Sequence, residues 1–120
     1  MQLVSIDHVQ LAMPKGEEAK ARSFYVDVLG MTEVPKPDAL KGRGGAWFSA
    51  GNIILHLGVE DKFRPAKKAH VALAIRETAA LRIKLLQNGY RVQDDDLIPN
   101  VKRFYSDDSF GNRIEFIELE

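Results

Sequence analysis

Three histidines and one glutamate are the side chains of this sequence whose types and positions could do chemistry. His8, His56, His70 and Glu115 each lie in a short run in which side chains alternate as in a β-strand, and the chain has no other histidine. Neutral imidazole and carboxylate are ligands that suit divalent ions such as Zn, Ni, Co, Mn or Fe(II). The pattern therefore predicts a metal site. The four runs are 6–12, 53–57, 69–75 and 113–117.

The alternative interpretation of these residues is structural. A single histidine on a strand is more often a hydrogen-bonded packing residue than a ligand. Four such groups at matching positions of the chain favour the metal site, and a degenerate site whose residues are retained for packing is the other possibility.

The elements that must position these groups follow from the periodicity of apolar residues. A helix is expected over 17–29, because Ala21, Phe24, Tyr25, Val28 and Leu29 have amphipathic spacing and Gly30 follows. A second helix is expected over about 78–88, with an apolar stripe that includes Ala79, Ile83 and Leu86. Residues 35–45 read as a polar loop. Strands are expected at 3–13, 46–49, 53–59, 69–76, 90–94, 102–106 and 113–119.

The order of elements repeats with a period near 60 residues. His8 and His70 lie 62 residues apart, and the turns at Gly51-Asn52 and Gly111-Asn112 lie 60 apart. This predicts an α+β fold of two βαβββ modules in a single domain over 1–120. The first module covers about 1–60, the second about 69–120, and 60–68 is the joint. Alternation places all four candidate ligands on the strand faces that point away from the helices.

Composition excludes several classes of function. Net charge is zero, with 17 basic and 17 acidic residues, which argues against a nucleic-acid binder. There is no cysteine, so disulfides and thiolate ligands are excluded. No apolar run approaches the ~20 residues of a membrane span, and the N-terminus lacks signal-peptide features, so a cytoplasmic protein is expected.

A few other residues could contact a substrate. Trp47 could line a pocket or belong to the core, and Arg43, Arg64 and Arg103 could hold an anion, although a solvated arginine is the commoner case. The acidic runs 94–96 and 107–108 are expected to be solvated loop residues.

Several stretches of the chain resemble the vicinal oxygen chelate superfamily, which includes glyoxalase I, fosfomycin-resistance thiol transferases, extradiol dioxygenases and bleomycin-resistance proteins. The resemblance implies a metal held by His8, His70 and Glu115, with His56 at a fourth position that glyoxalase I uses. It also implies a homodimer in which the first module of one chain pairs with the second module of its partner, and a site within one chain is the alternative. The stretches that carry it are 6–9, 21–31, 69–71 and 107–116, and the resemblance extends over essentially the whole chain.

The sequence also departs from each named activity. Glyoxalase I would have Glu where this chain has His56, and fosfomycin transferases have Thr where it has Gln10. Three functions therefore stay open. The first is a metal-dependent lyase or isomerase of the glyoxalase type, in which Glu115 is also the catalytic proton shuttle. The others are a fosfomycin-resistance-type thiol transferase and a non-catalytic dimer that sequesters a ligand. The expected substrate is a small molecule contacted by Gln10, Trp47, Arg64, Arg103 and Tyr105.

Overall fold

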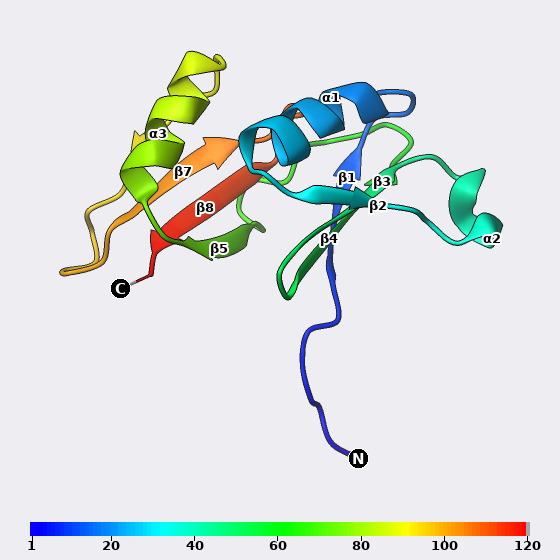
Figure 1. The fold of residues 1–120 in the computed structure, drawn as a ribbon, viewed down its shortest axis with the longest axis horizontal. Coiled ribbons are helices and arrows are strands. Elements are labelled where there is room, and N and C mark those ends of the chain that lie inside the picture. Colours follow the sequence, from blue (N-terminus) through cyan, green and yellow to red (C-terminus); the bar gives the residue numbers. More distant parts are fainter. Residues whose placement is uncertain (120) are drawn as a thin grey trace.

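The chain folds into two four-stranded sheets with helices on one side, as the computed structural model shows for residues 1–119 (Figure 1). The first sheet has the strand order β1-β4-β3-β2 and the second has β5-β8-β7-β6. The predicted α+β fold of two βαβββ modules is confirmed. The first module contains β1 (Val9–Met13), α1 (Glu18–Arg22), the π-helix η1 (Ser23–Val28), β2 (Thr32–Val34), α2 (Asp38–Lys41), β3 (Ala46–Ala50) and β4 (Ile53–Val59). The second contains β5 (Val71–Ile75), α3 (Thr78–Gln87), β6 (Gln93–Asp94), β7 (Arg103–Asp107) and β8 (Arg113–Glu118).

The same topology in both sheets places equivalent residues in equivalent rows. β1 runs parallel to β4 and β5 runs parallel to β8, while the remaining pairs are antiparallel. Both β1 and β5 therefore lie at an open edge of their sheet. None of the helices formed by residues 1–119 has the length and apolarity to cross a membrane.

The first helical segment packs as its spacing predicts, whereas the second turns a different face to the core. Ala21, Phe24, Tyr25 and Val28 are all buried, although the helix widens from α to π geometry at Ser23. In α3 the buried side chains are those of Thr78 and Leu85. The predicted stripe was wrong, because Ile83 and Leu86 are 57% and 58% exposed and Ala79 is exposed too. Leu81 packs against the core instead.

The N-terminal segment differs from the predicted strand over 3–13. Only Val9–Met13 pairs with β4, beginning with Val9 opposite Leu55, and residues 1–8 are extended, exposed and without regular structure. β4 itself begins at Ile53, so residues before Asp7 have no neighbouring strand in their own sheet. We call residues 1–8 the N-terminal arm. It projects away from both sheets (Figure 1).

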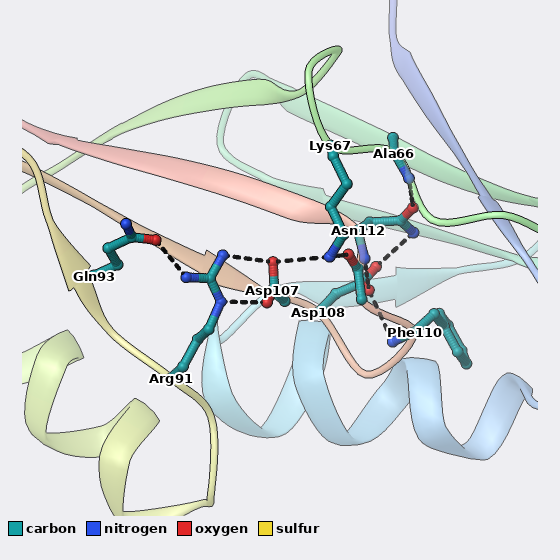
Figure 2. Close-up of polar contacts among 9 residues, drawn as sticks. Ala66, Lys67, Arg91, Gln93, Asp107, Asp108, Phe110 and Asn112 are labelled. Atoms are coloured by element: carbon teal, nitrogen blue, oxygen red, sulfur yellow. Dashed lines mark hydrogen bonds and ion pairs between the residues drawn. The ribbon is translucent and has the colours of Figure 1, made fainter.

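A buried polar cluster joins the two modules where the β7–β8 turn meets the end of β1 (Figure 2). The Asn112 side chain accepts a hydrogen bond from the Ala66 backbone at 2.9 Å and donates to the Ala12 carbonyl at 2.9 Å and to Asp108 at 3.0 Å. Asp108 also accepts from the Tyr25 hydroxyl at 2.6 Å and from the backbone N–H groups of Phe110 and Asn112, both at 2.9 Å. The expectation of solvated acids at 107–108 was therefore wrong: Asp108 is 4% exposed, and Asp107 is paired with Arg91.

Gly45 is needed where the chain enters β3. A Cβ atom placed there would lie 2.1 Å from the Leu57 carbonyl oxygen, and the residue has φ of 85°. Only glycine fits such a close approach in this backbone conformation. Gly45 thereby lets β3 pair closely with β4, the strand that carries His56.

Candidate metal and substrate site

The first module places two histidines together on the face that the helices leave open. The rings of His8 and His56 stack with centroids 4.1 Å apart, and the ring of Trp47 lies on His56 at 3.8 Å with parallel planes. Strand register explains this, because Gln10, His56 and Trp47 are direct neighbours across β1, β4 and β3. We call His8 and His56 the His–His pair.

The surroundings of His56 favour its neutral ring, and a carboxylate orients His8. Burial and the neighbouring His8 lower the pKa of His56, against a smaller opposing effect of Asp7. His8 Nδ1 lies 2.8 Å from an Asp7 carboxylate oxygen. Such a carboxylate fixes the tautomer of a histidine and leaves Nε2 as the ligand atom. A cleft of about 640 Å³ runs along the pair and Trp47.

The second module places a histidine and a carboxylate together at the matching location. His70 Nε2 lies 2.9 Å from Glu115 Oε1, and Glu115 Oε2 accepts a hydrogen bond from Arg103 at 3.2 Å. The ring of Tyr105 lies edge-on to His70 with centroids 5.5 Å apart. Ala72, Glu115 and Tyr105 form the row equivalent to Gln10, His56 and Trp47. We call His70 and Glu115 the His–Glu pair.

Hydrogen bonds hold the side chains of the His–Glu pair in place. His70 Nδ1 lies 2.9 Å from the Lys68 carbonyl oxygen and must carry a proton to bond it. Burial alone would raise the pKa of Glu115, but hydrogen bonds from His70 and Arg103 outweigh it and lower that pKa. The 2.9 Å separation of His70 Nε2 and Glu115 Oε1 is that of a hydrogen bond, so the two side chains are fixed side by side.

Each pair is incomplete as a metal site on its own. Within residues 1–119 no three His, Cys, Asp or Glu side chains come close enough together to hold a metal ion. The structure therefore brings the four predicted ligands together two by two rather than as one group.

The predicted substrate contacts fall on the same two faces with one exception. Gln10 and Trp47 line clefts beside the His–His pair, and Arg103 and Tyr105 lie beside the His–Glu pair. Arg64 lies in the exposed joint, and among the residues described no hydrogen bond or ion pair joins its side chain to either pair.

Two further residues lie near the His–Glu pair: Arg113, which was not singled out from the sequence, and Asp95, which was expected to be a solvated loop residue and is instead ion-paired and largely buried. Arg113 lies with its guanidinium carbon 5.2 Å from the centre of the Tyr105 ring, and Asp95 pairs with Arg103 at 3.1 Å. Arg113 could have been found from alternation, because it is two residues before Glu115 on the same strand face. Asp95 could not, because its loop carries no periodic signal.

Comparison with known proteins agrees with this architecture. The model of the Glyoxalase/Bleomycin resistance protein/Dioxygenase superfamily matches residues 5–116. A crystal structure of a glyoxalase family protein from Bacillus anthracis is 48% identical, with a TM-score of 0.94, and the match covers 100% of this chain and 98% of that one. Among curated proteins, none matches the chain.

More distant structures share the fold. The fosfomycin resistance protein FosX from Listeria monocytogenes is 12% identical with a TM-score of 0.80, covering 99% of this chain and 96% of that one. A variant of FosX in complex with Mn(II) and 1S,2S-dihydroxypropylphosphonic acid is 13% identical with a TM-score of 0.79, covering 97% and 90%. From the family match and the 48% identical structure, this chain belongs to the glyoxalase/bleomycin resistance protein/dioxygenase superfamily.

Proposed function

We propose that this protein is a divalent-metal-dependent lyase or isomerase of the glyoxalase type that acts on a small molecule. The observation that carries the proposal is the division of the four donors into two incomplete pairs. His56 and Glu115 occupy equivalent strand rows, and His8 and His70 directly precede the equivalent strands β1 and β5. Neutral imidazoles and an ionised carboxylate are the forms in which these side chains bind metal. The ion would be Zn, Ni, Co, Mn or Fe(II), and Mn(II) in the FosX complex is a precedent within the fold.

The two pairs supply one complete ligand set when the first module of one chain faces the second module of another. In that arrangement His8 and His56 come from one subunit and His70 and Glu115 from its partner. A two-fold dimer then has two equivalent sites. A bound metal supplies a Lewis acid that polarises a substrate oxygen.

The side chains of this chain have separate roles in such a reaction. Glu115, ionised because His70 and Arg103 hydrogen-bond it, is the one carboxylate among the four donors and accepts or returns the proton. Arg103 holds Glu115 in place and is itself held by Asp95. Trp47 covers one face of His56, so that ring has little freedom to turn away.

A second candidate is addition of a thiol to an epoxide or a similar electrophile. Its support is the guanidinium groups of Arg103 and Arg113, both within 6 Å of the Tyr105 ring centre and beside the His–Glu pair. Cations at this position suit an anionic substrate. Assays with α-keto aldehyde–thiol adducts and with anionic epoxides separate the two reactions.

Metal content and subunit mixing test the proposal. We expect protein purified without a polyhistidine tag to bind one divalent ion per chain, and His70→Ala or Glu115→Ala to weaken binding by about 10- to 100-fold or more. Mixing a His8→Ala chain with a Glu115→Ala chain should restore one site in each mixed dimer. Calorimetry measures the stoichiometry, and mass spectrometry confirms that subunits have exchanged.

Three results contradict the proposal. Stoichiometric binding that survives both single substitutions would show that the ligands lie elsewhere. Confirmed exchange without recovery of binding would rule out a site shared between subunits. Absence of metal together with tight binding of an aromatic compound would instead identify a ligand-sequestering dimer.

A further inference from the structure

A second cleft adjoins the one beside the His–His pair and shares a wall with it. Gln10, Leu40 and Trp47 line both the cleft of about 640 Å³ beside the pair and a smaller cleft of about 220 Å³. His56 lines the larger cleft and not the smaller one. A molecule that reaches His56 along the Trp47 ring therefore has room to extend into the smaller cleft.

The smaller cleft carries two positive charges and no negative one. Among the described residues, Lys36 and Arg43 line it and no aspartate or glutamate does. Within residues 1–119 no carboxylate lies within ion-pair distance of either cation, whereas Lys41 of the same loop pairs with Asp38 at 2.9 Å. A cleft lined by charges of one sign concentrates ligands of the opposite sign. We call it the Lys–Arg cleft.

A closed loop holds both cations at this cleft. Lys36 donates a hydrogen bond to the Gly44 carbonyl and so joins the two ends of the segment that contains α2. An ammonium group has three N–H bonds, so Lys36 keeps two for a ligand. Leu40, in α2, contributes to the walls of both clefts. This helix lies at the end of the molecule away from the second sheet (Figure 1), so the first module alone supplies the loop.

A glycine gives the Gln10 amide its place between the two clefts. A Cβ atom at Gly58 would lie 2.6 Å from Gln10 Nε2, so a larger residue there would push the amide away. Gln10 is also the direct neighbour of His56 across β1 and β4. Its NH₂ group is a third donor beside the ammonium and the guanidinium. Donors of these three kinds suit carboxylate and phosphate oxygens.

We infer that the Lys–Arg cleft binds an anionic group of the substrate, a carboxylate or a phosphate, while a flat apolar part of the same molecule lies against Trp47 and Leu40. The inference rests on the proposed function, because it names the class of small molecule that reaches the His–His pair. The guanidinium of Arg43 matches the paired oxygens of either anion, and the ammonium of Lys36 adds charge without a fixed geometry.

The charges around the two clefts determine which way such a molecule lies. Asp7, beside His8, lines the larger cleft and repels an anion, whereas the cations of the Lys–Arg cleft attract one. The anionic group therefore lies at Arg43, the apolar part lies along Trp47, and the opposite end of the molecule lies at the His–His pair. Substrates without an anionic group should bind more weakly.

Three naphthalene compounds that differ in one group test the inference. The anions 2-naphthoate and 2-naphthyl phosphate and the neutral 2-naphthamide share the same flat ring. Calorimetry measures their dissociation constants with the full chain, as purified and after treatment with EDTA, which removes any ion that an anion could bind directly. We expect at least one anion to bind about tenfold more tightly than the amide in both preparations, and the tighter anion identifies the group. Its advantage should shrink as salt rises from about 50 mM to about 500 mM.

Single substitutions locate the anionic group. Arg43→Gln should weaken binding of the tighter anion about tenfold and leave binding of 2-naphthamide within about twofold, which shows that the apolar wall is intact. Lys36→Gln should act in the same direction. Lys41→Gln is the matched control, because it removes the same charge from the same loop outside the cleft, and it should change anion binding by no more than about twofold.

Several results overturn the inference. Equal binding of the anions and the amide would show that the cations do not contact the ligand, and absence of anion binding at about 1 mM would reject the ligand class. Equal effects of Arg43→Gln and Lys41→Gln would show that only the overall charge matters. A loss in Arg113→Gln with none in Arg43→Gln would place the anion beside the His–Glu pair instead.

The two proposals can fail separately. Anion binding that depends on Arg43, in a protein that binds no divalent ion, would support the Lys–Arg cleft and reject the metal-dependent function. Metal binding by the four predicted donors, together with anion binding that does not depend on Arg43, would reject the role of the cleft alone.

Discussion

Replacing Asn112 with aspartate tests how strongly the buried polar cluster holds the two modules together. The substitution keeps the size of a side chain that is 0% exposed and changes only an amide NH₂ into an oxygen. The amide donates to the Ala12 carbonyl at 2.9 Å and to the Asp108 carboxylate at 3.0 Å. Asn112→Asp therefore removes both donors and brings a second carboxylate against Asp108.

The expected loss follows from these contacts. A buried hydrogen-bonding group left without its partner costs about 1–3 kcal/mol, and two are affected here. With the carboxylate repulsion, we expect the free energy of unfolding to fall by about 3–5 kcal/mol at pH 7. Natural domains are stable by only about 5–15 kcal/mol, so the variant should be close to unfolding.

Urea unfolding followed by circular dichroism measures this loss. Repulsion raises the pKa of the introduced carboxyl in the folded state. Its protonated form can donate again, so the deficit should be largest at neutral pH and should shrink as pH falls toward about 5. Asn100→Asp, the same change at an exposed residue, should cost less than about 0.5 kcal/mol. A loss below about 1 kcal/mol for Asn112→Asp, or one that is the same at both pH values, would refute the reasoning.

Three further predictions concern single residues. Burial, and then Asp108, raise the pKa of Tyr25 well above its ordinary value near 10. The stability that the neutral Tyr25 hydroxyl contributes should therefore be fully present below pH 10 and fall above it. In unfolding experiments Tyr25→Phe should reduce this alkaline loss and lower the free energy of unfolding at neutral pH by about 1–2 kcal/mol. Gly45→Ala should lower the free energy of unfolding, measured in urea, by more than about 2 kcal/mol. Gly42→Ala is the control, because a Cβ there would meet nothing within 4 Å, and it should change that free energy by less than about 1 kcal/mol. Equal effects of the two substitutions would contradict the close approach of Gly45 to the Leu57 carbonyl. With His56 as a fourth ligand, the iron-loaded protein should not cleave catechols, and oxygen uptake with a catechol would show that His56 does not bind the ion.

Local patterns were enough to predict most elements and the faces of the strands. Alternation in 9–13 and 71–75 depends on neighbouring residues only, and Leu11 and Met13 are buried as expected. The same alternation put His56 and Glu115 in equivalent rows, which register now shows. Sequence reasoning could therefore place His56 and Glu115 on equivalent strand faces, whereas His8 and His70 lie one residue before β1 and β5. That the four bind a metal stays a prediction.

Features that depend on distant partners could not be read from local patterns. The arm was predicted as strand because periodicity does not reveal whether a neighbouring strand exists. Asp108 looks like a turn residue in sequence, and its burial depends on Tyr25, 83 residues away. Leu81 and Leu85, rather than Ile83 and Leu86, face the core in α3 because the apolar residues of this helix occur on more than one side.

The stack of Trp47 on His56 gives this protein a built-in optical reporter. Trp47 is the chain's one tryptophan, and its indole lies 3.8 Å from the imidazole centre. Protonation of that imidazole, or the approach of an ion or a substrate to it, changes the electrostatic environment of the excited indole. The emission intensity of the unlabelled protein therefore follows events at His56 in real time, and stopped-flow fluorescence can separate the arrival of a ligand from any chemistry that follows.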